Sequence, residues 1–505
     1  MKIVLKNLVS GARKLGKMDK EIINKIFDFV ALIKYNGEKR DILEKGLKDF
    51  LLNPDKDIKI EDALKKAFES RTPFNKENTD RDLNNFLTTD ELFEIHDYLL
   101  TIDADQQDLI YYLSEKYSRY NDKLKSEIGV TVSDIINFSM ALRTIYYIDL
   151  QAQGYKFNPN VFSSKEEAYG LYNLQYPDEN SKKISEMASL LDKEAFIIFL
   201  NGVNNDKAMD PLLKNLDFLL NLLSFKQEDL VKDNKLRFQD KPLLKLNDET
   251  YIILNEVHLL YGLQSRLDTL LNNYQWYRDV KGMGFEKIAL DILEVINKNK
   301  RIEGKVNKNI NYKVDDSLCE LDGLINFQDF SWFVECKGRI PRSDSFKGDV
   351  ISVKRDIEKG ITSAEEQALR AIKESEKIGE IGGIKVNTKK GVLIITEGAY
   401  PNLNPNPISV FKRKDENYPR YIIGLLTLME ILRQHDIYYL QKFLEWRCDP
   451  QMPIHSMSEL DYWDYFTKMQ RGLDLKEGYD MSVKNHNKVF YIGNRFNAQK
   501  HIKGE

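Results

Sequence analysis

The sequence predicts a mainly α-helical N-terminal region followed by an α/β C-terminal domain. Apolar residues recur every three to four positions through residues 1–235, as in segment 19–30, which is typical of half-buried helices. After residue 236 β-prone runs appear, and from residue 284 the order becomes helix, strands, helix, strand, as in an α/β sandwich. A chain of 505 residues also exceeds one ordinary core and suggests two to four structural units.

Four segments are predicted along the chain. They are a helical region (1–235), a hairpin with a connecting helix (236–280), an α/β domain (281–448) and a C-terminal extension (449–505). The hairpin is expected because two β-prone runs, 237–246 and 250–254, flank an Asn-Asp turn. The boundary of the α/β domain is placed where Lys281-Gly282-Met283-Gly284 is expected to interrupt the helical pattern.

The α/β domain is predicted to alternate between helices and strands. Its first helix carries one apolar stripe, formed by Phe285, Ile288, Ala289, Ile292, Leu293 and Ile296. Strands are expected at 320–326, 330–335, 391–396 and 421–423, with one helix at 361–378 and another after the last strand. Ser363 and Glu366 have the spacing of a capping box, which predicts a helix start at that point.

The composition argues against several classes of protein. No run of about 18 apolar residues and no secretory signal is found, so we expect a cytoplasmic protein without a membrane partner. Three cysteines without a C-x-x-C pair and six histidines without H-E-x-x-H argue against a zinc centre. The formal net charge of -4 gives no general attraction to nucleic acid, so any such surface must be local.

Asp322, Glu335 and Lys337 form the pattern that indicates chemistry. Metal-dependent hydrolysis of a phosphodiester requires carboxylates on a rigid support and a cation near the phosphate. Glu335 and Lys337 are two positions apart on a predicted strand, so they share one face while Cys336 turns into the core. An antiparallel partner strand would bring Asp322 beside them. Ionised groups among apolar residues avoid burial unless they are paired or bind metal.

Asp322 followed by Glu335-x-Lys337 resembles the signature of the PD-(D/E)xK nuclease superfamily, although Leu321 stands where the family has proline. The resemblance covers about residues 284–400 and reaches residue 448 at most. It implies a restriction-endonuclease-like fold and a nuclease that depends on Mg²⁺ or Mn²⁺. Oxygen ligands suit such hard cations.

The resemblance also implies a set of metal ligands. Asp322 and Glu335 would bind the ion, with the backbone carbonyl of Cys336 as a further ligand. Some members of the superfamily carry a glutamate on the helix before the first strand, and Glu286 is the candidate here.

Two further residues receive roles from the resemblance. Lys337 would orient or help to deprotonate the attacking water and would steady the scissile phosphate. Gln367, on the helix after the lysine strand, would position the substrate or Lys337. Because Ala364, Ala368 and Ala371 lie three or four positions from Gln367, we expect Gln367 to face the sheet.

The segment after Lys337 is locally basic. Between Lys337 and Lys359 there are seven Lys or Arg residues and four acidic ones. Basic side chains near a nuclease site bind the phosphate backbone. The candidate nucleic-acid contacts are Arg339, Arg342, Lys347, Lys354 and Arg355.

The leading interpretation is a cytoplasmic, Mg²⁺-dependent DNA endonuclease. A helical region joined to such a domain resembles prokaryotic antiviral defence or restriction effectors, an analogy of fold only. An RNase of the same fold and a non-catalytic nucleic-acid-binding or scaffold protein remain alternatives, and the three motif residues could also form a solvated ion-pair ladder. No G-x-x-x-x-G-K-[ST] motif occurs, so ATP hydrolysis would need a separate sensor or ATPase partner. The helical region could also mediate homo-oligomers.

Overall fold

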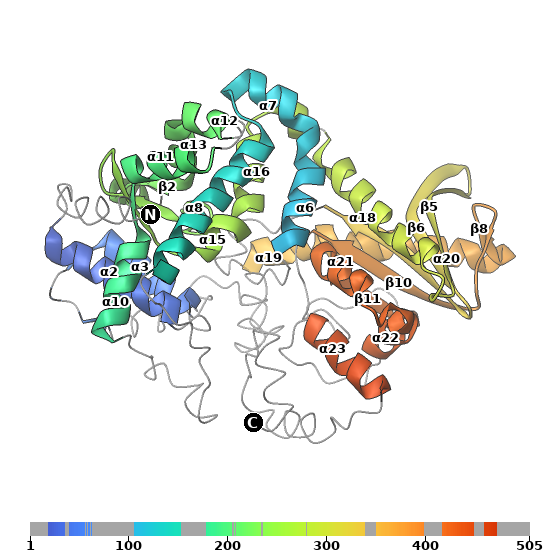
Figure 1. Cartoon of the computed structure of the whole chain (residues 1–505). Helices are drawn as coiled ribbons and strands as arrows, with labels where there is room; N and C mark the ends of the chain where they lie inside the picture. The colour runs from blue at the N-terminus through green and yellow to red at the C-terminus, as the bar shows by residue number, and fades with distance from the viewer. Residues whose placement is uncertain are drawn as a thin grey trace. The chain divides into compact units, whose positions relative to one another are not determined.

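A computed structural model of the chain describes seven stretches of residues, which fall into two compact units. The stretches are 19–35, 40–62, 106–152, 178–338, 350–397, 417–448 and 459–471, without residues 56, 58, 61, 205, 206, 208, 234, 235 and 279. The helical unit is assigned Met1–Arg71 and Leu113–Gln275, and the sheet unit is assigned Thr72–Tyr112 and Trp276–Glu505. Figure 1 labels their elements along the chain.

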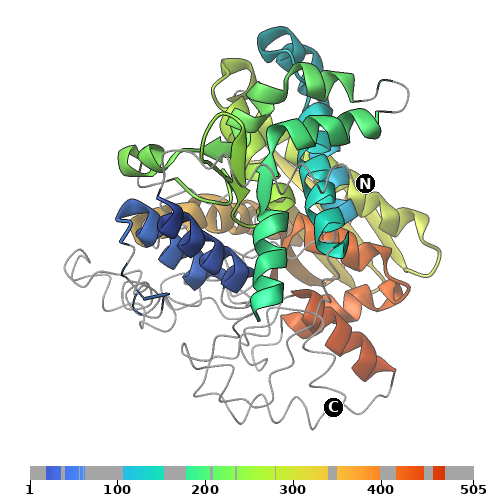
Figure 2. The same ribbon diagram turned by 60° about the vertical axis from the view of Figure 1, so that its left-hand side comes forward.

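Helices dominate the helical unit, as the sequence predicts. They are α2 (Lys20–Tyr35), α3 (Arg40–Leu52), α7 (Asn121–Ile128), α8 (Val132–Ala152), α10 (Glu179–Ser189), α11 (Lys193–Gly202), α12 (Asp210–Lys214), α13 (Leu216–Leu223), α14 (Gln227–Lys232), α15 (Val257–Tyr261) and α16 (Leu263–Leu271). Figure 2 shows α2, drawn in blue, beside α3 and the green helix α10, in agreement with their contacts. Helix α6 (Gln106–Tyr117) contributes residues to both units.

A small four-stranded sheet lies within the helical unit. Its order is β1 (Leu190–Asp192), β4 (Thr250–Ile253), β3 (Leu243–Lys245) and β2 (Ser224–Phe225). The antiparallel pair of β3 and β4 confirms the predicted hairpin. The two outer strands have only two or three residues, too few to show an alternating pattern. Buried residues of α2 and α3 share one apolar core with this sheet.

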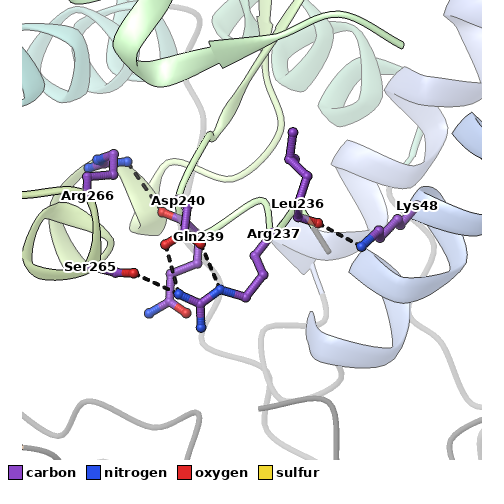
Figure 3. A network of polar contacts seen from close by, with 7 residues as sticks. All are labelled: Lys48, Leu236, Arg237, Gln239, Asp240, Ser265 and Arg266. Carbon is purple, nitrogen blue, oxygen red and sulfur yellow. Dashed lines mark hydrogen bonds and ion pairs between the residues drawn. The ribbon is translucent and has the colours of Figure 1, made fainter. Parts of the chain in front are cut away.

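A network of polar contacts joins the segment before β3 to α3 and α16 (Figure 3). Burial lowers the pKa of Arg266 to about 9, an effect that Asp240 opposes only in part. The bonds of the network run from Arg237 to Asp240 (2.8 and 2.9 Å) and Ser265 (2.7 Å), from Arg266 to the Gln239 carbonyl (3.4 Å), and from Lys48 to the Leu236 carbonyl (2.7 Å). These contacts bind most polar groups of a segment without regular structure, although Arg266 Nε is buried without a hydrogen-bond partner among the described residues.

A five-stranded mixed sheet forms the centre of the sheet unit. Its order is β11 (Arg420–Gly424), β10 (Lys389–Thr396), β7 (Phe330–Lys337), β6 (Ser317–Phe327) and β5 (Gly304–Val314). Strands β5, β6 and β7 pair antiparallel, whereas β7, β10 and β11 pair parallel. The four strands predicted in this domain are confirmed, and β5 is an addition that the sequence analysis missed.

Helices cover both faces of this sheet. On one face α20 (Ser363–Ile378) packs its alanines against Phe333 and Leu324. On the other face α18 (Lys281–Lys298) comes so close that a Cβ on Gly323 would lie 3.1 Å from Leu290 of this helix. The helical path from β7 to β10 consists of α19 (Val350–Ile357), the π-helical turn η6 (Glu358–Thr362) and α20, and it provides the crossover that a parallel pair requires.

The rest of the sheet unit consists of short elements. Helix α21 (Leu425–Arg433) contacts α18, and α23 (Glu459–Gln470) packs against α21. The remaining elements are α17 (Gln275–Arg278), η9 (Ile437–Tyr439), α22 (Leu440–Arg447) and the hairpin of β8 (Glu380–Ile381) and β9 (Ile384–Lys385).

Two sequence-based boundaries were wrong. The predicted interruption at Lys281–Gly284 is instead the first turn of α18, with Gly284 buried. Two glycines cost about 2 kcal/mol in a helix, and the buried apolar stripe that follows outweighs this cost. The predicted capping box of Ser363 and Glu366 was also wrong. The helix continues upstream into η6, and the Ser363 hydroxyl donates to the Lys359 carbonyl at 2.7 Å.

None of the described helices is by itself long and apolar enough to cross a membrane. The pair Gln107–Ile128 and Val132–Ile148 reaches the required length only together, with a bend of 89° between the two helices.

Candidate active site

The three motif residues lie together where β7 ends. Glu335 and Lys337 point to the face covered by α20, because they lie two and four positions after Phe333, which packs against that helix. The Lys337 ammonium donates to Glu335 Oε2 at 3.2 Å and to Gln367 Oε1 at 2.5 Å. The Lys337 ammonium therefore links β7 to α20 at the C-terminal end of β7.

Asp322 continues the contact between β6 and β7 where their backbone pairing stops. The recorded register ends with Gly323 opposite Val334. Beyond that point the Cys336 backbone N–H donates to Asp322 Oδ2 at 2.7 Å. The second carboxylate oxygen, Oδ1, has no hydrogen-bond partner among the described residues. One carboxylate oxygen of Asp322 is thus fixed by a hydrogen bond, and the other oxygen is available to bind a ligand.

Glu335 is the most unusual group of the cluster. Its side chain is 1% exposed, and its Oε1 atom is buried without a hydrogen-bond partner among the described residues. Burial, with the nearby Asp322 carboxylate as the second cause, raises the pKa of Glu335 to about 8, although Lys337 opposes the shift. Such a carboxyl group requires either a proton or a cation to compensate its charge.

Glu286, on the first turns of α18, adds a third acidic group to the same region. Burial and the neighbouring Asp322 and Glu320 raise its pKa above the ordinary value for glutamate. Within the described part of the chain, however, no three His, Cys, Asp or Glu side chains stand in an arrangement that could hold a metal. The candidate ligand set is therefore the pair Asp322 and Glu335, with Glu286 nearby and outside that pair.

The backbone between Glu335 and Lys337 is fixed on both sides. The Cys336 side chain is 6% exposed, as predicted, and burial raises the pKa of its thiol well above the usual value. After Lys337, a Cβ on Gly338 would lie 2.7 Å from the Cβ of Phe285 on α18. Only glycine fits at this position without movement of the helix.

The other predicted site residues are placed in part. Gln367 reaches Lys337 as described, but it is exposed, so the expectation that it faces the sheet was wrong. Ala364, Ala368 and Ala371 form the buried side of α20, and Gln367 lies at its border. Among the candidate phosphate contacts, Arg355 is exposed on α19 and Lys354 lies in the same helix, while Arg339, Arg342 and Lys347 fall outside the described residues.

The sequence analysis missed two residues at this edge. Glu397 follows β10, and its backbone N–H donates to the Lys337 carbonyl at 3.2 Å. Its carboxylate accepts a hydrogen bond of 2.5 Å from the Tyr112 hydroxyl on α6. An acid directly after the apolar run 391–396 was a signal that could have identified Glu397. Nothing in the sequence around Tyr112 connects it with a strand that lies 285 positions away.

Comparison with known proteins gives no assignment. No protein-family model, curated protein or solved structure matches the chain. The candidate site is therefore defined by its own residues: two carboxylates and one amine at a sheet edge, with an amide that holds the amine.

Proposed function

We propose that the sheet unit is a metal-dependent nuclease that hydrolyses phosphodiester bonds in DNA. The main support is the buried Glu335 carboxyl, which has one oxygen without a partner and lies beside Asp322 and Lys337. A structural ion pair would satisfy both oxygens, whereas a cation-binding carboxylate keeps one available. The raised pKa values of Glu335, Asp322 and Glu286 indicate the same need for positive charge.

Asp322 and Glu335 would hold Mg²⁺ or Mn²⁺, together with the Cys336 carbonyl and, as a further ligand, Glu286. When bound, the ion supplies charge neutralisation at the phosphate and lowers the pKa of a coordinated water. The fit rests on the donor set, because carboxylate and carbonyl oxygens are the ligands that these cations prefer. Without the ion, Glu335 carries a proton below a pH of about 8 and shares its Oε2 with Lys337.

Lys337 is the residue that we propose to orient the attacking water. Its side chain is 21% exposed, so it can contact both the buried carboxylate and a substrate phosphate. Gln367 accepts one of its three N–H bonds and thereby fixes the direction of the others. We assign Lys337 to orienting the water and the phosphate, and Gln367 to positioning Lys337.

The experiment is cleavage of a circular plasmid by the full-length chain with Mg²⁺, with Mn²⁺ or with EDTA. We expect cleavage with either ion and none with EDTA. Asp322→Asn and Lys337→Ala should abolish it, whereas Asp329→Asn should not, because Asp329 is an exposed acid that pairs with Lys389 at the other end of β7. Cleavage that survives Asp322→Asn would overturn the proposal. A matched RNA that is cut in place of DNA would favour the RNase alternative.

A further inference from the structure

The helical segment that carries Gln367 begins well before the candidate site. Helix α19, the π-helical turn η6 and helix α20 follow one another without a break from Val350 to Ile378. Gln367 lies within this segment, and its amide contacts Lys337. Any chain bound along the exposed face of this helix would therefore pass the candidate site.

The π-helical turn changes which residues share the face of Gln367. Arg355 precedes Gln367 by twelve positions, which in a regular helix would place it about 120° away around the axis. A π-helical turn accommodates one extra residue and reduces this angle to about 20°. The burial pattern agrees, because Arg355, Lys359, Gln367 and Arg370 are exposed whereas Ile361 and the alanines of α20 are buried.

Three cations on this face have no carboxylate partner among the described residues: Arg355, Lys359 and Arg370. Among the described residues, the Arg370 guanidinium donates one side-chain hydrogen bond, a weak one of 3.9 Å to the sulfur of Cys319. Lys377 on the same helix differs, because it pairs with Glu374 at 2.7 Å. Three exposed acids, Glu358, Glu366 and Glu376, also lie in this segment and reduce its net charge.

The cations lie on both sides of Gln367 along the helix axis. With a rise of about 1.5 Å per residue, Arg370 is about 4.5 Å beyond Gln367, and Lys359 is about 12 Å before it. Unpaired guanidinium and ammonium groups at such intervals match a chain of phosphates. A single phosphate or a nucleotide would not use cations on both sides.

We propose that one strand of the DNA substrate lies along this face, with Arg355 and Lys359 bound to phosphates on one side of the scissile position and Arg370 bound on the other side. The inference rests on the proposed nuclease function and specifies its substrate path. It implies cleavage within a strand, because both flanks of the scissile phosphate are held.

The test measures binding without cleavage. Anisotropy of a fluorescein-labelled DNA duplex is recorded with the full-length chain, without divalent cations, over a series of salt concentrations. Each lost phosphate contact lowers the slope of log affinity against log salt by about one. Arg370→Gln should therefore lower the slope by about one, and the combined Arg355→Gln, Lys359→Gln and Arg370→Gln variant by about three.

Lys377→Gln is the matched control, because it removes a cation from the same helix that is already paired with Glu374. Its slope should equal that of the wild type. A triple variant with the wild-type slope would overturn the inference, as would a wild type that does not bind the duplex. If the slopes change as expected but the plasmid is never cut, the strand path stands and the nuclease proposal fails.

Discussion

Replacing Glu335 by glutamine should stabilise the metal-free protein at neutral and alkaline pH. The carboxyl is buried and its pKa rises from 4.5 to about 8. Between these values the folded chain binds a proton that the unfolded chain releases, so the free energy of unfolding falls as the pH rises. The destabilising effect is absent below pH 4.5, grows through the window up to about 8, and is complete above it.

The size of this effect follows from the shift. One pKa unit corresponds to about 1.4 kcal/mol, so the full shift represents roughly 5 kcal/mol at most, and about 3 kcal/mol at pH 7. Glutamine keeps the shape of the side chain and an oxygen for Lys337, but it cannot ionise. We therefore expect Glu335→Gln to exceed the wild type by about 2 to 3 kcal/mol at pH 7 and to match it near pH 4.5.

The assay is urea unfolding of both proteins in EDTA at pH 5, 6, 7 and 8, followed by a signal of the sheet unit such as Trp332 fluorescence. The difference in stability should widen by about 1 kcal/mol per pH unit across this range. Added Mn²⁺ should stabilise the wild type and leave Glu335→Gln unchanged. A difference that stays constant from pH 5 to pH 8 would refute the reasoning, because it would mean that Glu335 is ionised throughout.

Two further substitutions test the support of the site. Tyr112→Phe should cost about 1 to 3 kcal/mol of stability and lower the cleavage rate with little change in KM, because Glu397 loses a buried hydrogen bond next to the Lys337 backbone. Tyr117→Phe is its control, since it removes another hydroxyl of α6, one that donates to Asp268 of α16. Equal rates in the two variants would contradict the role of Tyr112. Gly338→Ala should lower the melting temperature by an amount equivalent to about 1 to 3 kcal/mol, because its Cβ would meet α18 at 2.7 Å, and an unchanged melting temperature would mean that the helix moves freely.

The sequence predicted those strands of the sheet unit that an apolar run alone can identify. Apolar runs identified β6, β7, β10 and β11, because buried strands of five or more residues are rich in Val, Ile and Phe. Strand β5 was missed since its surface positions carry Lys and Asn, and because Asn309 has a positive φ of 51° in the middle of the strand. Short outer strands such as β2 are fixed by their neighbours rather than by their own residues.

The residues of the candidate site that the sequence predicted are those whose spacing along one strand or hairpin brings them together. Residues brought in by contacts between distant elements were not predicted. Two residues of one strand, Glu335 and Lys337, share a face by geometry, and a hairpin is enough to add Asp322. The contributions of Glu397 and Tyr112 depend on a parallel pairing with β10 and on the docking of α6. Neither the pairing of β7 with β10 nor the docking of α6 produces a periodic pattern in the sequence. The π-helical turn, in which Gly360 and Ile361 are buried, was not predicted from the sequence either.

The most direct test of the account is a calorimetric titration of the full-length chain with Mn²⁺. The account predicts saturable binding that is lost in Asp322→Asn and retained in Asp329→Asn, because Asp322 and Glu335 together form the candidate ligand pair. Mn²⁺ binding that is unchanged in Asp322→Asn, or a wild type that binds no Mn²⁺, would contradict it.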